Sequence, residues 1–600
     1  MGPRRLRRLG VGRGHVGAEM DPKVEAHPGP PVVVFQELRA RTVTEIRPGV
    51  FVLDYGQNFA GVPRIRLRGE PGQTITLRFA ERLNPDGSVY VTNLREARCI
   101  DTYVCKGTGE EEVWSPRFTF HGYQYLEVSG LTSPPNSETV VGLAVSSATP
   151  VVGRFETSDP MLNRLHSNIV WTQRANFIDI PTDCPQRDER LGWTGDAQVY
   201  VKTATLNTDV QAFFDKWLID LTDGQRADGQ FPMVAPVKVA GDDGGPAWAE
   251  AGVVCPWTIY QVYNDKDVLA RQYPSMTRYV DFLVNRSTPD LLPPEKYHCF
   301  GDWLSIGADT PKDVIYSAYF ALAARLTSRA AAVLGKDEDA KKYADVYEKV
   351  KASFNKAYVG DDGVIRGDTQ ACYVLALAND LVDGDKAAKA AELLVKRIED
   401  KDWHLSTGFI GTKDLMLVLS KIGRQDVAYR LLFNDTFPSL GFSIKQGATS
   451  IWERWDGWTP EKGFQDPGMN SFAHYSFGAV YGWMVENIGG IRATDVGYKT
   501  IAIEPRLTDR LPFATTSYRS VRGEIAVAWT RAAGGAVTLD VTIPPNTTAR
   551  VVLPAADPAA VRESGAPLAQ APGVKKAAAE NGETVAEIGS GRYVFTFAAP

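Results

Sequence analysis

The chain has 600 residues, with a hydrophobic content of 44%, a charged content of 23% and a formal net charge of -6. Its length exceeds the size at which one hydrophobic core keeps growing, so about two to four domains are expected. The acidic balance carries no electrostatic footprint for nucleic acid, and no apolar run reaches the roughly 20 residues of a membrane helix. We therefore expect neither a nucleic-acid partner nor a membrane, and the sequence leaves open whether the chain forms an oligomer.

The first 32 residues are basic and contain no apolar core of the kind found in secretory signals. We expect residues 1–32 to form a disordered leader, with Met20 as an alternative start, in a cytoplasmic protein. The six cysteines show no CxxC spacing, which predicts reduced thiols rather than a zinc site or a disulfide framework. Cys99 and Cys105 are the exception, because they could meet across a strand pair in an oxidising compartment.

Residues 33–149 alternate apolar and polar side chains with a period near two, which is typical of half-buried strands. The clearest run has Ile75, Leu77 and Phe79 alternating with Thr76 and Arg78. This pattern predicts an N-terminal antiparallel β-sandwich.

Residues 150–490 have helical apolar spacing. Leu162, Leu165 and Ile169 would share one face of a helix, and Ser158, placed before Asp159-Pro160, is the candidate N-cap. Several long helical runs follow, separated by loops rich in Gly, Pro and Asp. A helical domain is therefore expected.

Alternation returns in residues 491–600, where Val537, Leu539, Val541 and Ile543 would face one side of a strand. A second β-sandwich is expected there. The Ala/Pro/Gly-rich stretch of residues 555–579 is typical of a loop or of partly disordered chain.

The stretch DCPQRDERLGWTGD, residues 183–196, contains four acidic side chains together with Arg187 and Arg190. Exposed ion pairs on a solvated loop are the ordinary explanation for such charge. Pro181, Pro185 and the interleaved apolar residues instead predict a rigid, partly buried segment, where charge is costly unless it is paired or used. Because perturbed carboxylates cluster at functional sites, we interpret this strip as part of an active site.

Tryptophans indicate the class of ligand. All but two of the 13 indoles lie in the helical region, and several stand next to acids, as in Asp302-Trp303 and Trp452-Glu453. A single tryptophan is usually a core residue. The repeated pairing nevertheless suits sugars, whose rings have apolar faces and a rim of hydroxyls.

The sequence contains no GxSxG, HExxH or P-loop motif, and its histidines lack metal-ligand spacing, so we expect no metal and no cofactor. Carboxylate chemistry remains, in the strip and in the distant ATSIWERWDGW segment, which contains Glu453 and Asp456. Two carboxylates facing one bond are the arrangement of glycoside hydrolysis. One protonates the leaving oxygen, and the other activates water or attacks carbon.

A series of motifs resembles bacterial α-L-rhamnosidases of glycoside hydrolase family 78: DCPQRDERLGWTGDAQ, DDGGPAWAEAG, GDW, HLSTGFIGT, ATSIWERWDGW and MNSFAHYSFGAVYGWM. The resemblance implies an (α/α)6-barrel catalytic domain at residues 150–490, flanked by antiparallel β-sandwich domains at 33–149 and 491–600. It also implies hydrolysis with inversion. Many members carry further domains ahead of this region, so we expect a reduced reach toward polymeric substrates.

Position by position, the resemblance implies Glu189 as the general acid and Glu453 as the general base. An inverting pair would place the two carboxyls about 6.5–9.5 Å apart, leaving room for water. Asp188 is explained equally well as a neighbour that positions other side chains. The residues implied to bind the sugar are Asp183, Arg187, Asp188, Trp193, Asp196, Trp248, Trp303 and His474.

The leading hypothesis is an enzyme that releases terminal α-L-rhamnose from small or oligosaccharide rhamnosides. One alternative is an inverting hydrolase of another α-L-glycoside on the same barrel. Another is a carbohydrate-binding protein without catalysis, which the presence of both Glu189 and Glu453 disfavours. A polysaccharide lyase is disfavoured because no Tyr or His base is evident beside neutralising cations.

Overall fold

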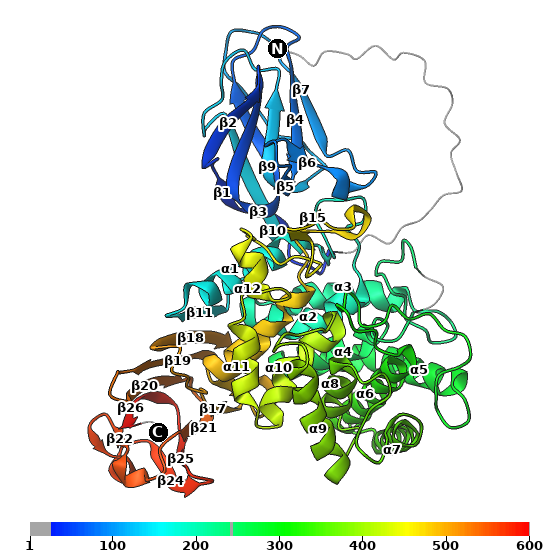
Figure 1. Cartoon of the computed structure of the whole chain (residues 1–600), viewed down its shortest axis with the longest axis vertical. Coiled ribbons are helices and arrows are strands. Elements are labelled where there is room, and N and C mark those ends of the chain that lie inside the picture. Colours follow the sequence, from blue (N-terminus) through cyan, green and yellow to red (C-terminus); the bar gives the residue numbers. More distant parts are fainter. Residues whose placement is uncertain (1–25, 241–243, 599–600) are drawn as a thin grey trace.

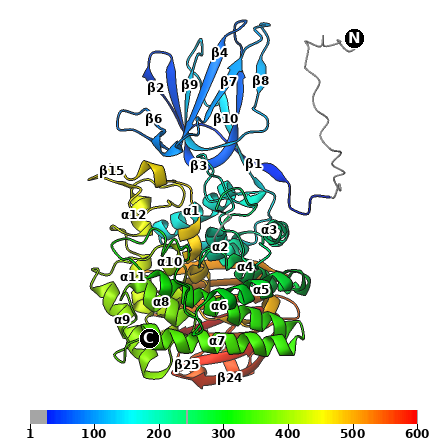
Figure 2. The ribbon, with the colours of Figure 1, turned by 90° about the vertical axis from the view of Figure 1, so that its right-hand side faces the viewer.

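The computed structural model describes residues 26–240 and 244–598, which form a sheet region, a helical region and a second sheet region (Figure 1). The N-terminal sheet region stands over one end of the helical region, and the C-terminal sheets lie against the helices away from it (Figures 1 and 2). Within these described ranges, no helix is long and apolar enough to cross a membrane.

The predicted leader falls mostly on residues 1–25, outside the described residues. Its last part is structured, which corrects the prediction. His27 Nε2 lies 3.0 Å from an oxygen of Asp179, Ala148 N donates to Pro31 O, and the first strand begins at Val32. These tertiary contacts hold residues 26–31 against the folded chain.

The N-terminal region is built on an eight-stranded antiparallel sheet in the order β1-β10-β3-β9-β4-β7, in which β2 and β8 also pair with β3. The predicted alternation is confirmed, because Ile75, Leu77 and Phe79 of β4 are fully buried. Cys99 Sγ contacts Gln186 O at 3.0 Å, and all six cysteines are free. The bounds are β1 Val32–Leu38, β2 Thr42–Arg47, β3 Val50–Leu67, β4 Thr74–Ala80, β5 Arg82–Leu83, β6 Val89–Tyr90, η1 Thr92–Leu94, β7 Ile100–Val104, β8 Glu112–Trp114, β9 His121–Ser129 and β10 Val140–Ser147.

Helices of two kinds alternate along the helical region. Most positions are buried in α2, α4, α6, α8 and α10, whereas α1, α3, α5, α7 and α9 bury mainly one face. An inner layer enclosed by an outer layer requires this difference. The bounds are α1 Pro160–Asn176, α2 Thr194–Asn207, α3 Gln211–Asp223, α4 Ala251–Tyr263, α5 Lys266–Arg286, α6 Lys312–Val333, α7 Asp337–Tyr358, α8 Gln370–Ala378, α9 Gly384–Glu399, α10 Phe409–Lys421, α11 Gln425–Leu432, α12 Leu440–Lys445 and α13 Tyr481–Trp483.

Helix α1 has the predicted buried face of Leu162, Leu165 and Ile169. Its N-cap is Asp159 rather than Ser158, because the Asp159 carboxylate accepts hydrogen bonds from Met161 N and Leu162 N. Proline takes the first helical position, so the cap falls on the residue directly before it.

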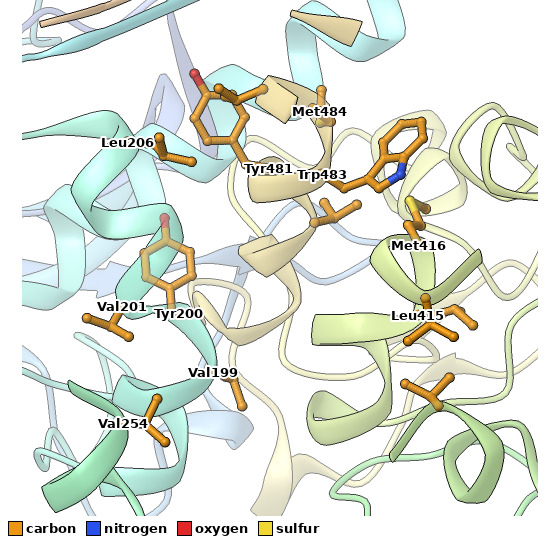
Figure 3. Packing of buried hydrophobic residues seen from close by; sticks show 14 of the residues in the cluster. Val199, Tyr200, Val201, Leu206, Val254, Leu415, Met416, Tyr481, Trp483 and Met484 are labelled. Atoms are coloured by element: carbon orange, nitrogen blue, oxygen red, sulfur yellow. The ribbon is translucent and has the colours of Figure 1, made fainter. Parts of the chain in front are cut away.

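Large apolar side chains fill the space between α2, α10 and α13. Figure 3 shows Tyr200 of α2, Leu415 of α10 and Trp483 of α13 in one cluster. The Trp483 indole donates a hydrogen bond of 2.7 Å to Ser420 Oγ, which satisfies its polar atom inside the core. The first and last parts of the helical region therefore share one packed interior.

The C-terminal region has a seven-stranded and a five-stranded sheet. The alternation predicted for residues 537–543 is confirmed in β20. Residues 555–579 were expected to be loop or disordered, but they contain short elements, since β22 pairs with β26 and β24 with β25. The bounds are β16 Ile491–Ala493, η5 Val496–Tyr498, β17 Thr500–Ile503, β18 Phe513–Ser520, β19 Gly523–Arg531, β20 Ala536–Ile543, β21 Thr548–Leu553, η6 Pro558–Ala560, β22 Arg562–Glu563, β23 Ala566–Pro567, η7 Leu568–Gln570, β24 Val574–Glu580, β25 Glu583–Ile588 and β26 Gly591–Ala598.

One strand of the seven-stranded sheet precedes the helical region in the sequence, whereas the other strands follow it. Strand β11 (Gly153–Thr157) precedes α1 and pairs antiparallel with β18, from Gly153 opposite Tyr518 to Thr157 opposite Ala514. The helical region is therefore bracketed by two strands of one sheet.

The N-terminal sheet region contacts the loops that follow α12. The ring of Tyr90 stacks at 3.7 Å on Phe464 of β15 (Gly463–Phe464), which pairs with β14 (Trp458–Thr459). Figure 2 shows β15 beside the N-terminal strands. Buried Glu81 accepts hydrogen bonds from Phe472 N (3.1 Å) and Asn93 Nδ2 (3.0 Å). Burial raises the pKa of Glu81 to about 7. A stacked pair and a buried carboxyl thus join the two regions.

Candidate active site

The strip from Asp183 to Asp196 leads from β13 (Ile180–Pro181) to the first turn of α2. Its backbone folds back on itself, because Asp183 N donates to Leu191 O and Leu191 N donates to Asp183 Oδ1, both at 2.9 Å. Residues 181–187 are all buried. The prediction that the segment is partly buried is confirmed.

Glu453 lies far along the chain, in the loop after α12. The loop is fixed by two 2.9 Å hydrogen bonds: Glu453 N donates to Ser471 O, and Ser471 N donates to Glu453 Oε2. The Glu453 residue is 2% exposed. The same pairing places His474 beside it, because His474 N donates to Ile451 O at 2.8 Å.

Arg187 joins the two segments. Its Nη1 lies 3.1 Å from Glu453 Oε2, and its Nη2 lies 3.4 Å from Glu453 Oε1, 2.8 Å from Glu189 Oε2 and 3.6 Å from Asp183 Oδ2. The residue is 1% exposed. A forked, permanently charged donor suits this position, because buried carboxylates need a cation and several hydrogen bonds.

The surroundings give the carboxyls different proton affinities. Burial alone would raise the pKa of Glu453, but the charge of Arg187 and the Ser471 N–H hold it below its usual value. Glu453 is therefore ionised at neutral pH. In Asp183, burial and the charge of Glu189 outweigh Arg187 and raise the pKa to about 7.

His474 and Asp196 form a buried pair, with His474 Nε2 3.1 Å from Asp196 Oδ1. Burial lowers the pKa of His474 to about 4, so its ring is neutral at pH 7. Burial and the charge of Asp183 raise the pKa of Asp196 well above its usual range. His474 Nδ1 is buried and has no hydrogen-bond partner among the residues that the structure describes.

Glu189 is the more open of the two predicted catalytic carboxyls, with 15% of its side chain exposed. Its Oε1 accepts a 2.9 Å hydrogen bond from Trp193 Nε1. Its Oε2 lies 2.8 Å from Nη2 of Arg187 and also 2.8 Å from Nη2 of Arg95. Arg95 belongs to the N-terminal sheet region, and no sequence signal pointed to it.

A cavity of about 130 Å³ lies between these groups. Phe300 packs between Trp248 and Trp303, with ring centroids 4.8 and 5.5 Å away. Phe300 and Met469 were not predicted, although Phe300 precedes the GDW motif and Met469 is the first residue of the MNSFAHYSFGAVYGWM motif. A larger cavity, about 420 Å³, lies between α2, α4 and α10 and contains none of the predicted site residues. The smaller cavity, of about 130 Å³, is lined by Asp183, Arg187, Glu189, Trp193, Asp196, Trp248, Phe300, Trp303, Glu453, Met469 and His474.

Three acidic residues noted in the sequence lie outside this lining. Asp188, predicted to bind substrate, instead lies 3.7 Å from Arg95 Nη1 and accepts a hydrogen bond from Glu96 N, so it contacts the N-terminal region. Asp302 accepts hydrogen bonds from backbone N–H groups at the start of α10, where a negative charge is favourable. Asp456 pairs with Arg454.

Asp183, Cys184 and Glu189 bring ligand atoms within 4.8 Å of one another, close enough to share a metal ion. Two features favour a different use. Burial raises the pKa of the Cys184 thiol well above its usual value, and a protonated thiol is a poor metal ligand. Arg187 already places its positive charge beside both carboxyls.

Comparisons with known proteins cover most of the chain. Residues 150–488 match the family described as the bacterial alpha-L-rhamnosidase 6 hairpin glycosidase domain, residues 44–146 the concanavalin-like domain and residues 490–566 the C-terminal domain of the same group. An alpha-L-rhamnosidase of Streptomyces avermitilis is 47% identical over 94% of this chain and 54% of its own length. One of Formosa agariphila is 39% identical over 84% of this chain and 55% of its own.

Solved structures agree. The Streptomyces avermitilis alpha-L-rhamnosidase complexed with L-rhamnose superposes with a TM-score of 0.91 at 46% identity, covering 95% of this chain and 54% of the other. The native enzyme of Aspergillus terreus gives 0.88 at 32% identity, covering 95% and 64%. The chain thus spans about half the length of the curated relatives that it matches.

Proposed function

Because the chain belongs to the bacterial α-L-rhamnosidase family, we propose that it hydrolyses terminal α-L-rhamnosides. The observation that carries the proposal is the cavity, where aromatic side chains surround the carboxyls of Glu189 and Glu453, which come from distant segments of the chain. A relative with a similar structure is described in complex with L-rhamnose. Small or oligosaccharide rhamnosides are the proposed substrates.

The finer architecture is part of the proposal. The alternation of buried and half-exposed helices supports an (α/α)6 barrel in the helical region, with the sheets to either side layered as β-sandwiches. This barrel places the ends of several inner helices and their loops around one cavity. A cytoplasmic location and the absence of nucleic-acid and membrane partners stay predictions.

The cavity suits a 6-deoxy sugar. Trp193, Trp248 and Trp303 offer flat apolar surfaces to the ring and to its methyl group. His474 Nδ1 offers an unpaired acceptor or donor to a hydroxyl, and the buried Nε of Arg187 also lacks a partner among the described residues. Buried polar groups without partners are costly, so a ligand whose hydroxyls satisfy them binds favourably.

In the proposed reaction, Glu189 protonates the leaving oxygen and Glu453 takes a proton from the attacking water. The lowered pKa of Glu453 supports its role as the base. Both carboxyls contact Arg187 Nη2, at 2.8 and 3.4 Å, so their nearest oxygens are at most 6.2 Å apart. This upper limit falls short of the spacing of about 6.5–9.5 Å expected for an inverting pair, so the distance between the two carboxyls does not by itself support inversion. The family resemblance favours inversion.

Proton NMR of an aryl α-L-rhamnoside during hydrolysis tests substrate, activity and stereochemistry together. We expect β-rhamnose as the first product from the wild type, and loss of turnover in Glu189→Gln and Glu453→Gln. Glu461→Gln, an exposed acid outside the cavity lining, is the matched control and should retain activity. Near-wild-type rates in both site variants would refute the assignment. A panel of aryl glycosides that showed preference for another α-L-sugar would replace rhamnose as the substrate.

A further inference from the structure

Arg95 is the point at which the N-terminal sheet region reaches the proposed active site. It follows η1 in a left-handed backbone conformation (φ 57°), and its side chain is 27% exposed. Its Nε donates to Gly468 O and its Nη2 donates to Glu189 Oε2, both at 2.8 Å. One guanidinium therefore links the N-terminal sheet region to the strip and to the segment just before Met469, a residue that lines the cavity.

The two carboxyl oxygens of Glu189 have different neighbours. A carboxylate oxygen offers two lone-pair sites. At Oε2, Arg95 Nη2 donates a hydrogen bond of 2.8 Å and Arg187 Nη2 forms an ion pair at the same distance, so two positive charges stand beside this oxygen. At Oε1, the described residues supply one donor, the indole N–H of Trp193. Two cations beside Oε2 make it the less favourable position for a proton, so a proton on Glu189 is directed to Oε1, whose one donor among the described residues is a neutral indole.

We propose that Arg95 is a positioning residue for the general acid: together with Arg187 it occupies Oε2 and directs the acidic proton of Glu189 to Oε1. The inference rests on the function proposed above, in which Glu189 is the acid. Arg95 makes no bond to substrate in this proposal. The other charged or titratable groups around Glu189 are Asp183, Cys184 and Arg187 of the strip and His474 of the facing loop, with Glu453 reached through Arg187.

Loss of Arg95 should have two effects. A vacant site on Oε2 lets the proton leave Oε1, and the carboxyl loses an anchor, so proton donation is impaired. Removing a cation 2.8 Å from a carboxylate also favours its protonated form. The first effect depends on how much the leaving group needs a proton. The second moves the alkaline limb of the pH–rate profile to higher pH, because that limb reports ionisation of the acid.

The test compares Arg95→Gln with Arg95→Lys in the full chain. Arg98→Gln is the matched control: an exposed arginine three residues later, with no ion pair or hydrogen bond recorded in the described structure. Each variant is assayed on methyl α-L-rhamnoside, a poor leaving group, and on 2,4-dinitrophenyl α-L-rhamnoside, a good one. For Arg95→Gln we expect kcat to fall about 10- to 100-fold on the methyl glycoside and under about threefold on the dinitrophenyl glycoside. Its alkaline limb should move up, while Arg95→Lys keeps the wild-type limb and recovers part of the loss.

Equal losses on the two substrates, or an unmoved alkaline limb in Arg95→Gln, would overturn the assignment. Melting temperature and L-rhamnose affinity verify folding. If Arg95→Gln does not fold, Arg95→Lys alone decides: a loss confined to the methyl glycoside supports the proposal, and an equal loss refutes it. A wild-type protein that hydrolyses neither rhamnoside would refute the proposed function instead.

Discussion

Replacing Arg187 by glutamine tests whether this residue holds the base in its ionised form. Arg187 is 1% exposed and forks onto Glu453 through Nη1 and Nη2. Burial raises the pKa of Glu453 and the charge of Arg187 lowers it. In Arg187→Gln the effect of burial remains and the charge is gone, so Glu453 should stay protonated to a higher pH. The acid limb of the pH–rate profile should then move up.

The size of the change follows from the burial of the pair. Removing one partner of a buried ion pair costs about 3–5 kcal/mol. Ser471 N still donates to Glu453, so the lower end applies. About 3 kcal/mol is a factor of roughly 150 in a protonation equilibrium, which moves the acid limb up by about two pH units. At pH 5 the variant should therefore lose activity relative to its own optimum to a greater extent than the wild type does.

Initial rates on an aryl α-L-rhamnoside between pH 4 and pH 10 measure the limb. Arg454→Gln is the control, because Arg454 neighbours Glu453 in sequence, is 19% exposed and pairs with Asp456 and Asp466. Its acid limb should match that of the wild type. An acid limb in Arg187→Gln within half a pH unit of the wild type would show that Arg187 does not set the charge of Glu453.

Three further changes probe other contacts. The pKa of Glu81 is raised from 4.5 to about 7, so its stabilising contribution is complete below pH 4.5 and is lost as pH rises through 7. Glu81→Gln should therefore gain melting temperature over wild type at pH 8 but not at pH 4.5, and fluorimetry showing the same difference at both would contradict this. Trp193→Phe keeps the ring but removes the N–H on Glu189, so kcat should fall about tenfold with KM little changed; steady-state kinetics showing the reverse pattern would argue against it. In Gly195→Ala the new Cβ would lie 2.5 Å from the Trp248 ring, and calorimetry should find L-rhamnose binding weakened about tenfold or more; an unchanged Kd would mean that Trp248 is not a wall of the sugar site.

Features carried by local periodicity could be predicted from the sequence. In β4, β20 and α1 the buried apolar residues recur every few positions, so the sequence shows directly which side chains are buried. The charged strip could also be recognised from the sequence, because its acids, arginines and prolines stand within a few positions of one another. The N-cap of α1 was misplaced by one residue because two capping residue types stand side by side before the proline.

Features that depend on distant partners could not be predicted. Arg95 contacts Glu189 across 94 positions, and nothing in its own neighbourhood distinguishes it from Arg98. Asp188 shares the strip's composition but pairs with the N-terminal region. The order in residues 555–579 comes from pairing with β25 and β26, which composition does not reveal.

The position of β11 affects the order in which the chain completes its fold on the ribosome. Thr157 of β11 pairs with Ala514 of β18. At about 5–20 residues per second, roughly 360 residues take about 20–70 s to synthesise, so β11 emerges long before its partner. During that interval its backbone donors and acceptors form an open edge next to α1, available to chaperones or to other nascent chains. The seven-stranded sheet therefore cannot be completed until β18 has been synthesised.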